Sequence, residues 1–131
     1  MELRISENIN IATGIDIVDN RRIRKKIRDQ KFIQRVLSPT EIESFEQIKN
    51  EKRKVEFLAG RFSAKESITK ALKFKPNFKN ITVIPFSTVQ IEKIHLEKIK
   101  NELKVKDLRI NISISHETNY TVSMSLILLF Y

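Results

Sequence analysis

The segment GRFSAKES, residues 60–67, places charged side chains inside a stretch that is otherwise apolar. Apolar residues recur in and around it at the three- and four-residue spacing of an α-helix. At about 100° per residue, Phe62 lies on the side of Glu66, whereas Ile68 lies on the opposite side. A helix that is apolar on two sides is usually central and buried. We therefore predict a long central helix over about 51–73.

The carboxylate of Glu66 extends one of these two apolar stripes. An ionised carboxylate in such a place needs a partner, because an unpaired buried charge costs several kcal/mol or shifts the pKa of the group. The ordinary partner is Lys70, four residues on along the same helix. The alternative partner is a metal ion, and helical periodicity leaves both interpretations open.

A second carboxylate, Asp16, lies in the segment GIDIV within a predicted strand at 9–18. Aspartate is disfavoured in the middle of a strand, so its presence there indicates a specific role. The alternative is that the strand has already ended and that Asp16 begins a turn that caps the following helix. Both interpretations stay open from the sequence.

A histidine, His116, follows a predicted strand and opens the segment HETNY. A single loop histidine is most often a solvated residue. Its ordinary pKa, near 6.5, also suits a proton carrier or a donor to a phosphate.

The remaining pattern predicts an α+β domain with an antiparallel sheet, spanning 1–131 as one unit. SPTE at 38–41 is a capping box with proline at the first helical position, so a helix begins there and runs to about Ile48. The other expected elements are strands at 80–86, 88–94, 108–115 and 120–130 and a short helix at 95–104.

The composition limits the possible functions. The chain of 131 residues has no cysteine, which excludes disulfides and thiolate chemistry. The apolar run at 125–131 is too short to cross a bilayer, and 1–13 has no signal-peptide layout. We expect a cytosolic protein that does not bind membranes.

The formal net charge is +9, which suits a polyanion, an acidic protein or a phosphorylated ligand. Much of this charge lies in a predicted helix at about 19–36, where residues 21–35 hold eight cations and one acid. Eight cations against one acid exceed what solubility requires, which favours a binding surface for an anionic partner. The alternative is a basic face that only contacts solvent.

Three segments together resemble the motifs of the holo-[acyl-carrier-protein] synthases, the short 4'-phosphopantetheinyl transferases. They are GIDIVDNRRI at 14–23, FLAGRFSAKESITKAL at 57–72 and ISISHETNYTVSMSL at 112–126. The resemblance implies a fold in which an antiparallel sheet packs against a long central helix, with a basic N-terminal helix. It also implies transfer of 4'-phosphopantetheine from coenzyme A to a serine of apo acyl carrier protein, with adenosine 3',5'-bisphosphate as the by-product.

Residue by residue, the resemblance makes Asp16 and Glu66 the ligands of Mg²⁺, a metal that prefers oxygen ligands and keeps several waters. Together with Lys70 they would form the catalytic group. The general base stays open between Glu66 and a metal-bound water. Coenzyme A would be bound by five further residues: Arg61, Lys65, His116, Lys52 and Arg53.

The basic helix would contact the acidic acyl carrier protein, mainly through electrostatic steering and register. The expected contacts are Arg21, Arg22, Arg24, Lys25 and Arg28. Family members are homotrimers with active sites between subunits, so the resemblance implies a homotrimer here as well.

One stretch departs from the family pattern, because residues 72–80 contain no glycine where many members are glycine-rich. The hypothesis for this stretch is that Lys73, Lys75 and Lys79 bind phosphate in place of backbone N–H groups. Two alternatives to the enzyme remain. A nucleic-acid-binding domain fits the +9 charge and the aromatic residues. A purely structural basic trimer leaves Asp16, Glu66 and His116 without a shared purpose.

Overall fold

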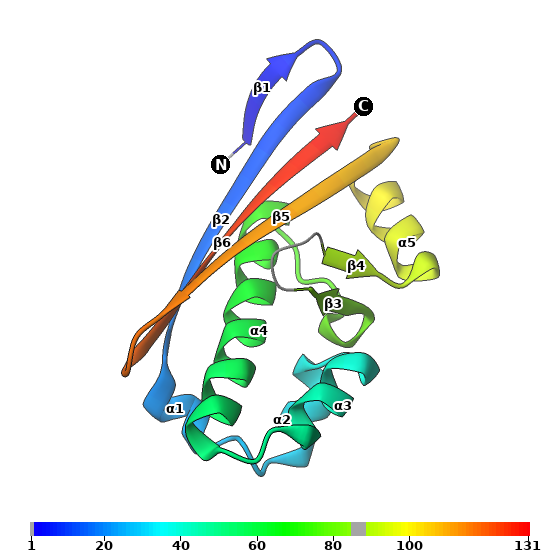
Figure 1. The fold of residues 1–131 in the computed structure, drawn as a ribbon. Coiled ribbons are helices and arrows are strands. Elements are labelled where there is room, and N and C mark those ends of the chain that lie inside the picture. Colours follow the sequence, from blue (N-terminus) through cyan, green and yellow to red (C-terminus); the bar gives the residue numbers. More distant parts are fainter. Residues whose placement is uncertain (1, 85–88) are drawn as a thin grey trace.

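The computed structural model describes residues 2–84 and 89–131. Its main feature is a four-stranded antiparallel sheet with the strand order β1-β2-β6-β5, crossed on one face by the long helix α4 (Figure 1). The α+β architecture predicted from the sequence is confirmed. The strands of this sheet are β1 (Glu2–Ser6), β2 (Ile9–Asp19), β5 (Asp107–His116) and β6 (Tyr120–Phe130).

Helix α4 (Glu51–Leu72) confirms the predicted central helix. The Asn50 side chain caps its N-terminus by accepting a hydrogen bond from the Arg53 backbone N–H at 3.0 Å. The helix ends at Lys73, which has a left-handed backbone conformation with φ of 65°. These two caps explain why the observed bounds differ from the predicted ones by one residue only.

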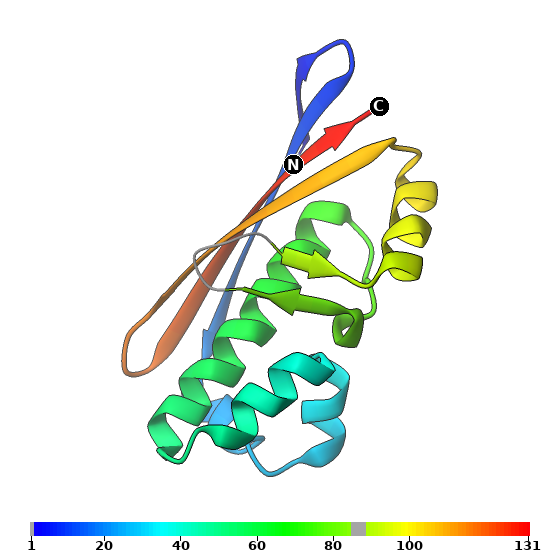
Figure 2. The ribbon, with the colours of Figure 1, turned by 45° about the vertical axis from the view of Figure 1, so that its right-hand side comes forward.

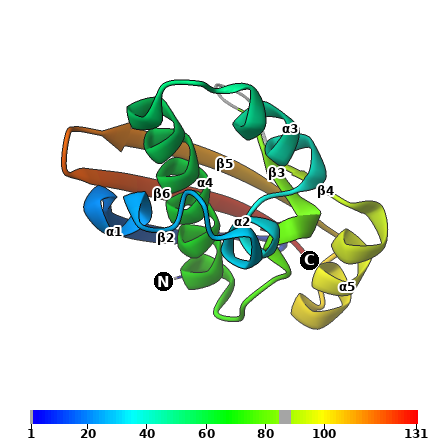
Figure 3. The same cartoon turned by 90° about the horizontal axis from the view of Figure 1, so that it is seen from below.

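Two apolar clusters meet α4, as expected for a helix with two apolar sides. Ile68 packs with sheet residues such as Ile127 in one cluster. Leu58 packs with Phe32 and Phe45 from the short helices in the other. Figure 3, seen from below, shows these two short helices on the same side of α4.

The basic segment does not form the single helix expected at 19–36. It forms α1 (Asn20–Arg24) and α2 (Gln30–Val36), with a break at 25–29. The Asp29 carboxylate accepts a hydrogen bond from the Phe32 backbone N–H at 3.1 Å and so begins a new helix. The closely spaced cations before Asp29 also repel one another, which weakens a continuous helix through the break.

Helix α3 (Pro39–Gln47) begins with the predicted capping box. The Ser38 hydroxyl accepts from the Glu41 backbone N–H at 3.3 Å, and the Glu41 carboxylate accepts from the Ser38 backbone N–H at 2.9 Å. This part of the sequence-based prediction is confirmed, and α3 ends within one residue of the expected position.

The middle of the chain forms a separate two-stranded sheet instead of joining the large one. Its strands are β3 (Ile81–Val83) and β4 (Val89–Ile91), preceded by the 3₁₀ turn Phe78–Asn80 and followed by α5 (Lys93–Leu103). Figure 2 shows this pair and α5 beside the C-terminal half of α4. The predicted strands at 80–86 and 88–94 are too long, and 85–88 lies outside the described residues. The second strand is short because the Glu92 carboxylate caps α5.

Strand β1 was not among the expected elements. It pairs with the start of β2, with Leu3 opposite Ile11, and all five of its residues are exposed. Such a short edge strand buries little apolar surface, so its sequence carries a weak signal.

The packing of β2 on α4 depends on Gly14. A Cβ atom at this position would lie 1.9 Å from the Ser67 carbonyl oxygen and 2.9 Å from the Ala71 nitrogen. Backbone atoms cannot yield as a flexible side chain can, so the strand and the helix approach this closely only at a glycine.

We predict that Gly14→Ala destabilises the protein by at least about 3 kcal/mol in urea denaturation, because strand and helix must separate. Gly60→Ala is the matched control. A Cβ there meets its nearest neighbours at 3.7 Å, and alanine is the better helix former, so it should be neutral or stabilise by up to about 1 kcal/mol. Equal stability of the two variants would contradict this account of the packing.

Candidate active site

Asp16 lies within β2, where it pairs with Ser123 of β6. Its carboxylate faces α4 and forms an ion pair with Lys70, with Oδ1 and Nζ 2.9 Å apart. The Lys70 ammonium also donates to the Ile15 carbonyl at 3.0 Å. The strand has therefore not ended at Asp16, and the residue that caps α1 is Asp19.

Glu66 faces the same space as Asp16. The two residues line a cavity of about 480 Å³, here called the carboxylate cavity, together with Arg22, Lys25 and Phe62. Lys70, the ordinary partner expected for Glu66, pairs with Asp16 instead. Among the described residues Glu66 forms no ion pair within 4.0 Å, so its charge is available to a ligand.

These two carboxylates fit a magnesium site. Mg²⁺ is commonly held by one or two carboxylates, with water and substrate phosphate as the other ligands. No group of three or more possible metal-ligating side chains occurs in the described parts of the chain. The donor set therefore suits a metal shared with a phosphate better than a metal enclosed by protein alone.

A second cavity, of about 410 Å³, lies between α4, β3 and β5 and is here called the arginine cavity. Arg53, Arg61 and His116 line it, together with Glu56 and Phe57. The family resemblance assigns Arg53, Arg61 and His116 to coenzyme A, and the structure brings these three residues together. His116 is the last residue of β5, and its Nδ1 lies 3.3 Å from Glu56 Oε2.

Arg61 is the most buried cation of the arginine cavity. Its guanidinium carbon lies 4.0 Å from the centre of the Phe57 ring, and its Nε is buried without a hydrogen-bond partner in the described structure. Burial lowers the pKa of Arg61, and the Glu41 carboxylate, 3.9 Å from Nε, opposes part of that shift. The side chain thus retains donors for an anionic ligand.

The carboxylate cavity and the arginine cavity share no lining residue. Counted at about 100° per residue, Gly60 and Arg61 lie more than about 100° around α4 from Glu66. The two groups of predicted site residues therefore lie on different sides of one helix.

Lys65 lines neither cavity and is fully buried. Its ammonium donates to Glu41 Oε1, to the Val36 carbonyl at 2.8 Å and to the Phe78 carbonyl at 3.0 Å. Desolvation lowers the pKa of Lys65, and the charge and hydrogen bond of Glu41 counter it. Because these acceptors match the three donors of an ammonium, the contact between Lys65 and coenzyme A stays a prediction without geometric support.

Glu41 was not singled out as a site residue by the sequence, although its role in the capping box was predicted. Only 3% of the residue is exposed. Besides Ser38 and Lys65, its carboxylate accepts from the Val83 backbone N–H at 2.8 Å. One side chain thus joins α3, α4 and β3. The capping-box pattern was the available signal, but it does not reveal the partners on α4 and β3.

The predicted carrier contacts differ in their availability. Arg22 and Lys25 are exposed and line the carboxylate cavity. Arg21 is held by Asp19, with Nε and Oδ1 2.9 Å apart, and also contacts the Tyr120 hydroxyl at 3.3 Å. Arg24 and Arg28, also predicted to contact the carrier, are exposed and line neither cavity. The same is true of Lys52, which was predicted to bind coenzyme A.

The stretch without glycine contributes little to these two cavities. Lys75 lies with its ammonium 5.0 Å from the centre of the Phe78 ring. It lines a neighbouring hollow that also contains Glu66 and Arg35. The binding of phosphate by Lys73, Lys75 and Lys79 stays a prediction.

Both the sequence and the fold of this chain are similar to those of known proteins. A sequence model of the 4'-phosphopantetheinyl transferase superfamily matches residues 12–125, and the chain belongs to this superfamily. Strand β1 lies outside the matched range. The nucleic-acid alternative receives no support from this match.

Within the superfamily, the resemblance to the holo-[acyl-carrier-protein] synthases is confirmed. The protein of that name from Mycoplasma capricolum is 40% identical over 116 residues, covering 86% of this chain and 90% of that protein. Its Geobacillus counterpart is 41% identical over 118 residues, covering 89% and 95%. A Bacillus anthracis holo-(acyl-carrier-protein) synthase, solved in complex with CoA (3',5'-ADP), has a TM-score of 0.70 at 26% identity, covering 92% and 96%.

In the described residues, none of the helices combines the length and the apolar character needed to cross a membrane.

We predict that Glu41→Gln lowers the free energy of unfolding by about 3–5 kcal/mol, because Lys65 is left as an uncompensated buried charge. Adding Lys65→Met to this variant should recover a substantial part of the loss, since it removes the unpaired charge at position 65. Urea denaturation of the unaltered protein, Glu41→Gln, Lys65→Met and the double variant measures this coupling. Additive losses would show that the two side chains do not stabilise each other.

Proposed function

We propose that this chain transfers 4'-phosphopantetheine from coenzyme A to a serine of apo acyl carrier protein and releases adenosine 3',5'-bisphosphate. The observation that carries the proposal is the carboxylate cavity, where Asp16 and Glu66 from two separate motifs meet beside Arg22 and Lys25. Carboxylates at a metal and cations beside it are what a reaction at a diphosphate requires.

In this proposal Asp16 and Glu66 hold Mg²⁺. When bound, the metal neutralises the diphosphate and the charge that develops on the leaving group. The two side chains belong to different elements, β2 and α4, that are fixed by the close contact at Gly14. Their positions are therefore set before any ligand enters, which lowers the cost of organising the site.

Lys70 is proposed to stabilise the leaving group at its phosphate. Its side chain is 55% exposed, whereas that of Asp16 is only 13% exposed, so the carboxylate is the member of the pair that needs a partner. The ammonium can move to a phosphate oxygen once a cation bound at Asp16 replaces its charge. In the resting protein the same pair keeps the Asp16 carboxylate turned toward α4.

The arginine cavity is proposed to bind the adenosine 3'-phosphate part of coenzyme A. Arg53 and Arg61 supply guanidinium donors for a phosphate, while Phe57 and Ile114 supply an apolar wall for a base. His116 adds an imidazole nitrogen that can form a hydrogen bond with the phosphate or with the base.

The acidic carrier protein is proposed to dock on the basic segment that contains α1. Arg22 and Lys25 border the carboxylate cavity, so a carrier held there would bring its serine to the metal site. Arg24 and Arg28, which are exposed outside the cavity, would act through longer-range steering.

We further propose a homotrimer in which the arginine cavity of one chain faces the carboxylate cavity of another. The two cavities share no lining residue and lie on different sides of α4, which suits a ligand held between two chains. The sheet face away from α4 offers an interface: Ile15, Ile17 and Met124 are 61%, 64% and 44% exposed. Ile15 and Met124 are cross-strand partners, so these side chains form a continuous apolar surface.

The transfer is tested by mass spectrometry of an apo acyl carrier protein incubated with this protein, coenzyme A and Mg²⁺. We expect the carrier to gain the mass of one phosphopantetheine. Glu66→Gln and Asp16→Asn should fold normally and lower kcat at least about 100-fold, because each removes a metal-binding charge. Lys31→Gln, at a cation outside the proposed contacts, is the control and should retain activity. A carrier that stays unmodified by the unaltered protein would refute the proposed reaction.

The trimer is tested by sedimentation equilibrium. Ile15→Glu should give monomers, because an unpaired carboxylate buried in an interface costs several kcal/mol. Ile94→Glu, at a residue on α5 that is 68% exposed, should leave the assembly unchanged. A monomeric unaltered protein, or equal masses for the two variants, would contradict the proposed interface.

A further inference from the structure

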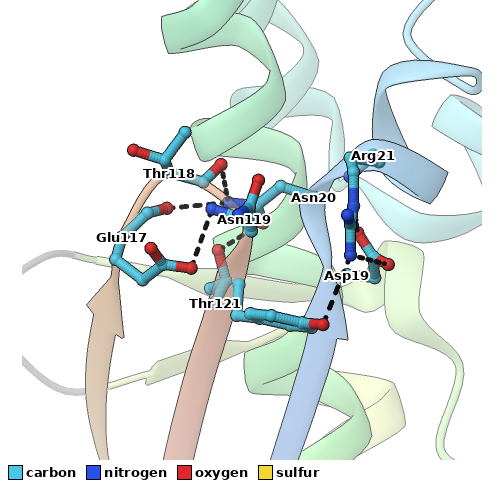
Figure 4. A network of polar contacts seen from close by, with 8 residues as sticks. Asp19, Asn20, Arg21, Glu117, Thr118, Asn119 and Thr121 are labelled. Carbon is cyan, nitrogen blue, oxygen red and sulfur yellow. Dashed lines mark hydrogen bonds and ion pairs between the residues drawn. The ribbon is translucent and has the colours of Figure 1, made fainter.

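Asn20, the first residue of α1, is almost entirely buried, with 4% exposed. Figure 4 shows its amide group pointing into the turn that joins β5 and β6. Its Nδ2 donates to the Glu117 and Thr118 carbonyls at 3.0 and 3.3 Å, and its Oδ1 accepts from the Thr121 hydroxyl at 2.7 Å. The Asn20 backbone N–H donates to the Asn119 carbonyl at 2.7 Å.

The three side-chain hydrogen bonds are specific for asparagine, whereas the backbone bond is open to any residue but proline. The amide supplies two donors to two carbonyls and one acceptor to a hydroxyl, so its donors and its acceptor are all used. Aspartate of the same shape lacks the donors, and a hydrophobic residue would leave the Thr121 hydroxyl buried and unpaired. Thr121 is itself fully buried, so water cannot readily replace the lost partner.

Besides the Asn20 hydrogen bonds, helix α1 follows β2 directly and packs against α4. It contains five residues, which is little more than one helical turn. Ile23 anchors it in the core, and the break at 25–29 separates it from α2. The neighbouring cations repel one another, so the segment has little intrinsic tendency to hold one orientation.

We propose that Asn20 is a positioning residue for the carrier protein, because it clamps α1 to the β5–β6 turn and so fixes Arg22 and Lys25 beside the carboxylate cavity. This inference rests on the proposed function, since it assigns the docking role to the same α1 cations. Asn20 touches neither metal nor substrate. Its loss should raise the cost of ordering α1 when the carrier binds, which weakens carrier binding and leaves the chemical step unchanged.

The test first measures the Kd for apo carrier protein by calorimetry without coenzyme A. Steady-state kinetics then give kcat, the KM for the carrier and the KM for coenzyme A. Asn20→Ala should raise the Kd and the KM for the carrier roughly 3- to 10-fold, with kcat and the KM for coenzyme A unchanged. Thr121→Val, which removes one of the bonds, should give a smaller rise. Thr121→Ser keeps the hydroxyl and should restore the original values.

Two controls separate positioning from general stability. Ser125→Ala removes a buried hydroxyl on the same strand that has no partner among the described residues, and should change no constant. Ile127→Val lowers stability in the cluster between sheet and α4, remote from α1, and should leave carrier affinity unchanged. A weakened carrier affinity in Ile127→Val equal to that in Asn20→Ala would overturn the inference.

The other outcomes are also decisive. A rise in the KM for coenzyme A with an unchanged carrier Kd would mean that Asn20 acts on His116 through the turn that joins β5 and β6. That result would overturn the inference. If Arg22→Ala weakens the carrier and Asn20→Ala does not, the inference fails while the proposed function stands. If the unaltered protein neither binds nor modifies the carrier, the proposed function itself fails and the inference with it.

Discussion

The arrangement of the site depends on one close contact between two backbones, that of β2 at Gly14 and that of α4 at Ser67. Glu66 precedes Ser67 by one residue, and Asp16 follows Gly14 by two residues on the same face of the strand. The missing side chain therefore brings carboxylates from two distant motifs into one cavity and places Lys70 within reach of Asp16. The proposed metal site would need no loop to close it, because both carboxylates belong to regular elements, a strand and a helix.

A buried pair of opposite charges complements this contact inside the domain. Glu41 and Lys65 are both nearly inaccessible, and their hydrogen bonds reach the α2 end at Val36, the 3₁₀ turn at Phe78 and the β3 strand at Val83. Burying such ions is costly, so the pair contributes to the specificity of the arrangement more than to net stability. It fixes the short elements against α4, while the cations that face the two cavities keep donors for ligands.

Some locally encoded features could be predicted from the sequence, whereas the grouping of distant residues could be predicted only through the motifs. The α3 start followed from Ser38 and Glu41 because a capping box is local. The break before Asp29 was missed because its cap competes with a helix pattern that continues through it. Lys70 was expected beside Glu66 at i+4, yet the strand supplied Asp16 as a closer partner. The site was found through its motifs, since periodicity alone left each carboxylate with an ordinary explanation.

The placement of the two cavities on different sides of α4 has a genetic consequence. In the proposed trimer every active centre is built from two copies of the chain, one giving the carboxylates and the other the arginines. Two alleles with defects in different cavities would then complement each other in mixed assemblies, because some centres combine the intact halves. An allele with both defects would contribute no functional half and would lower the activity of the normal copies that it joins.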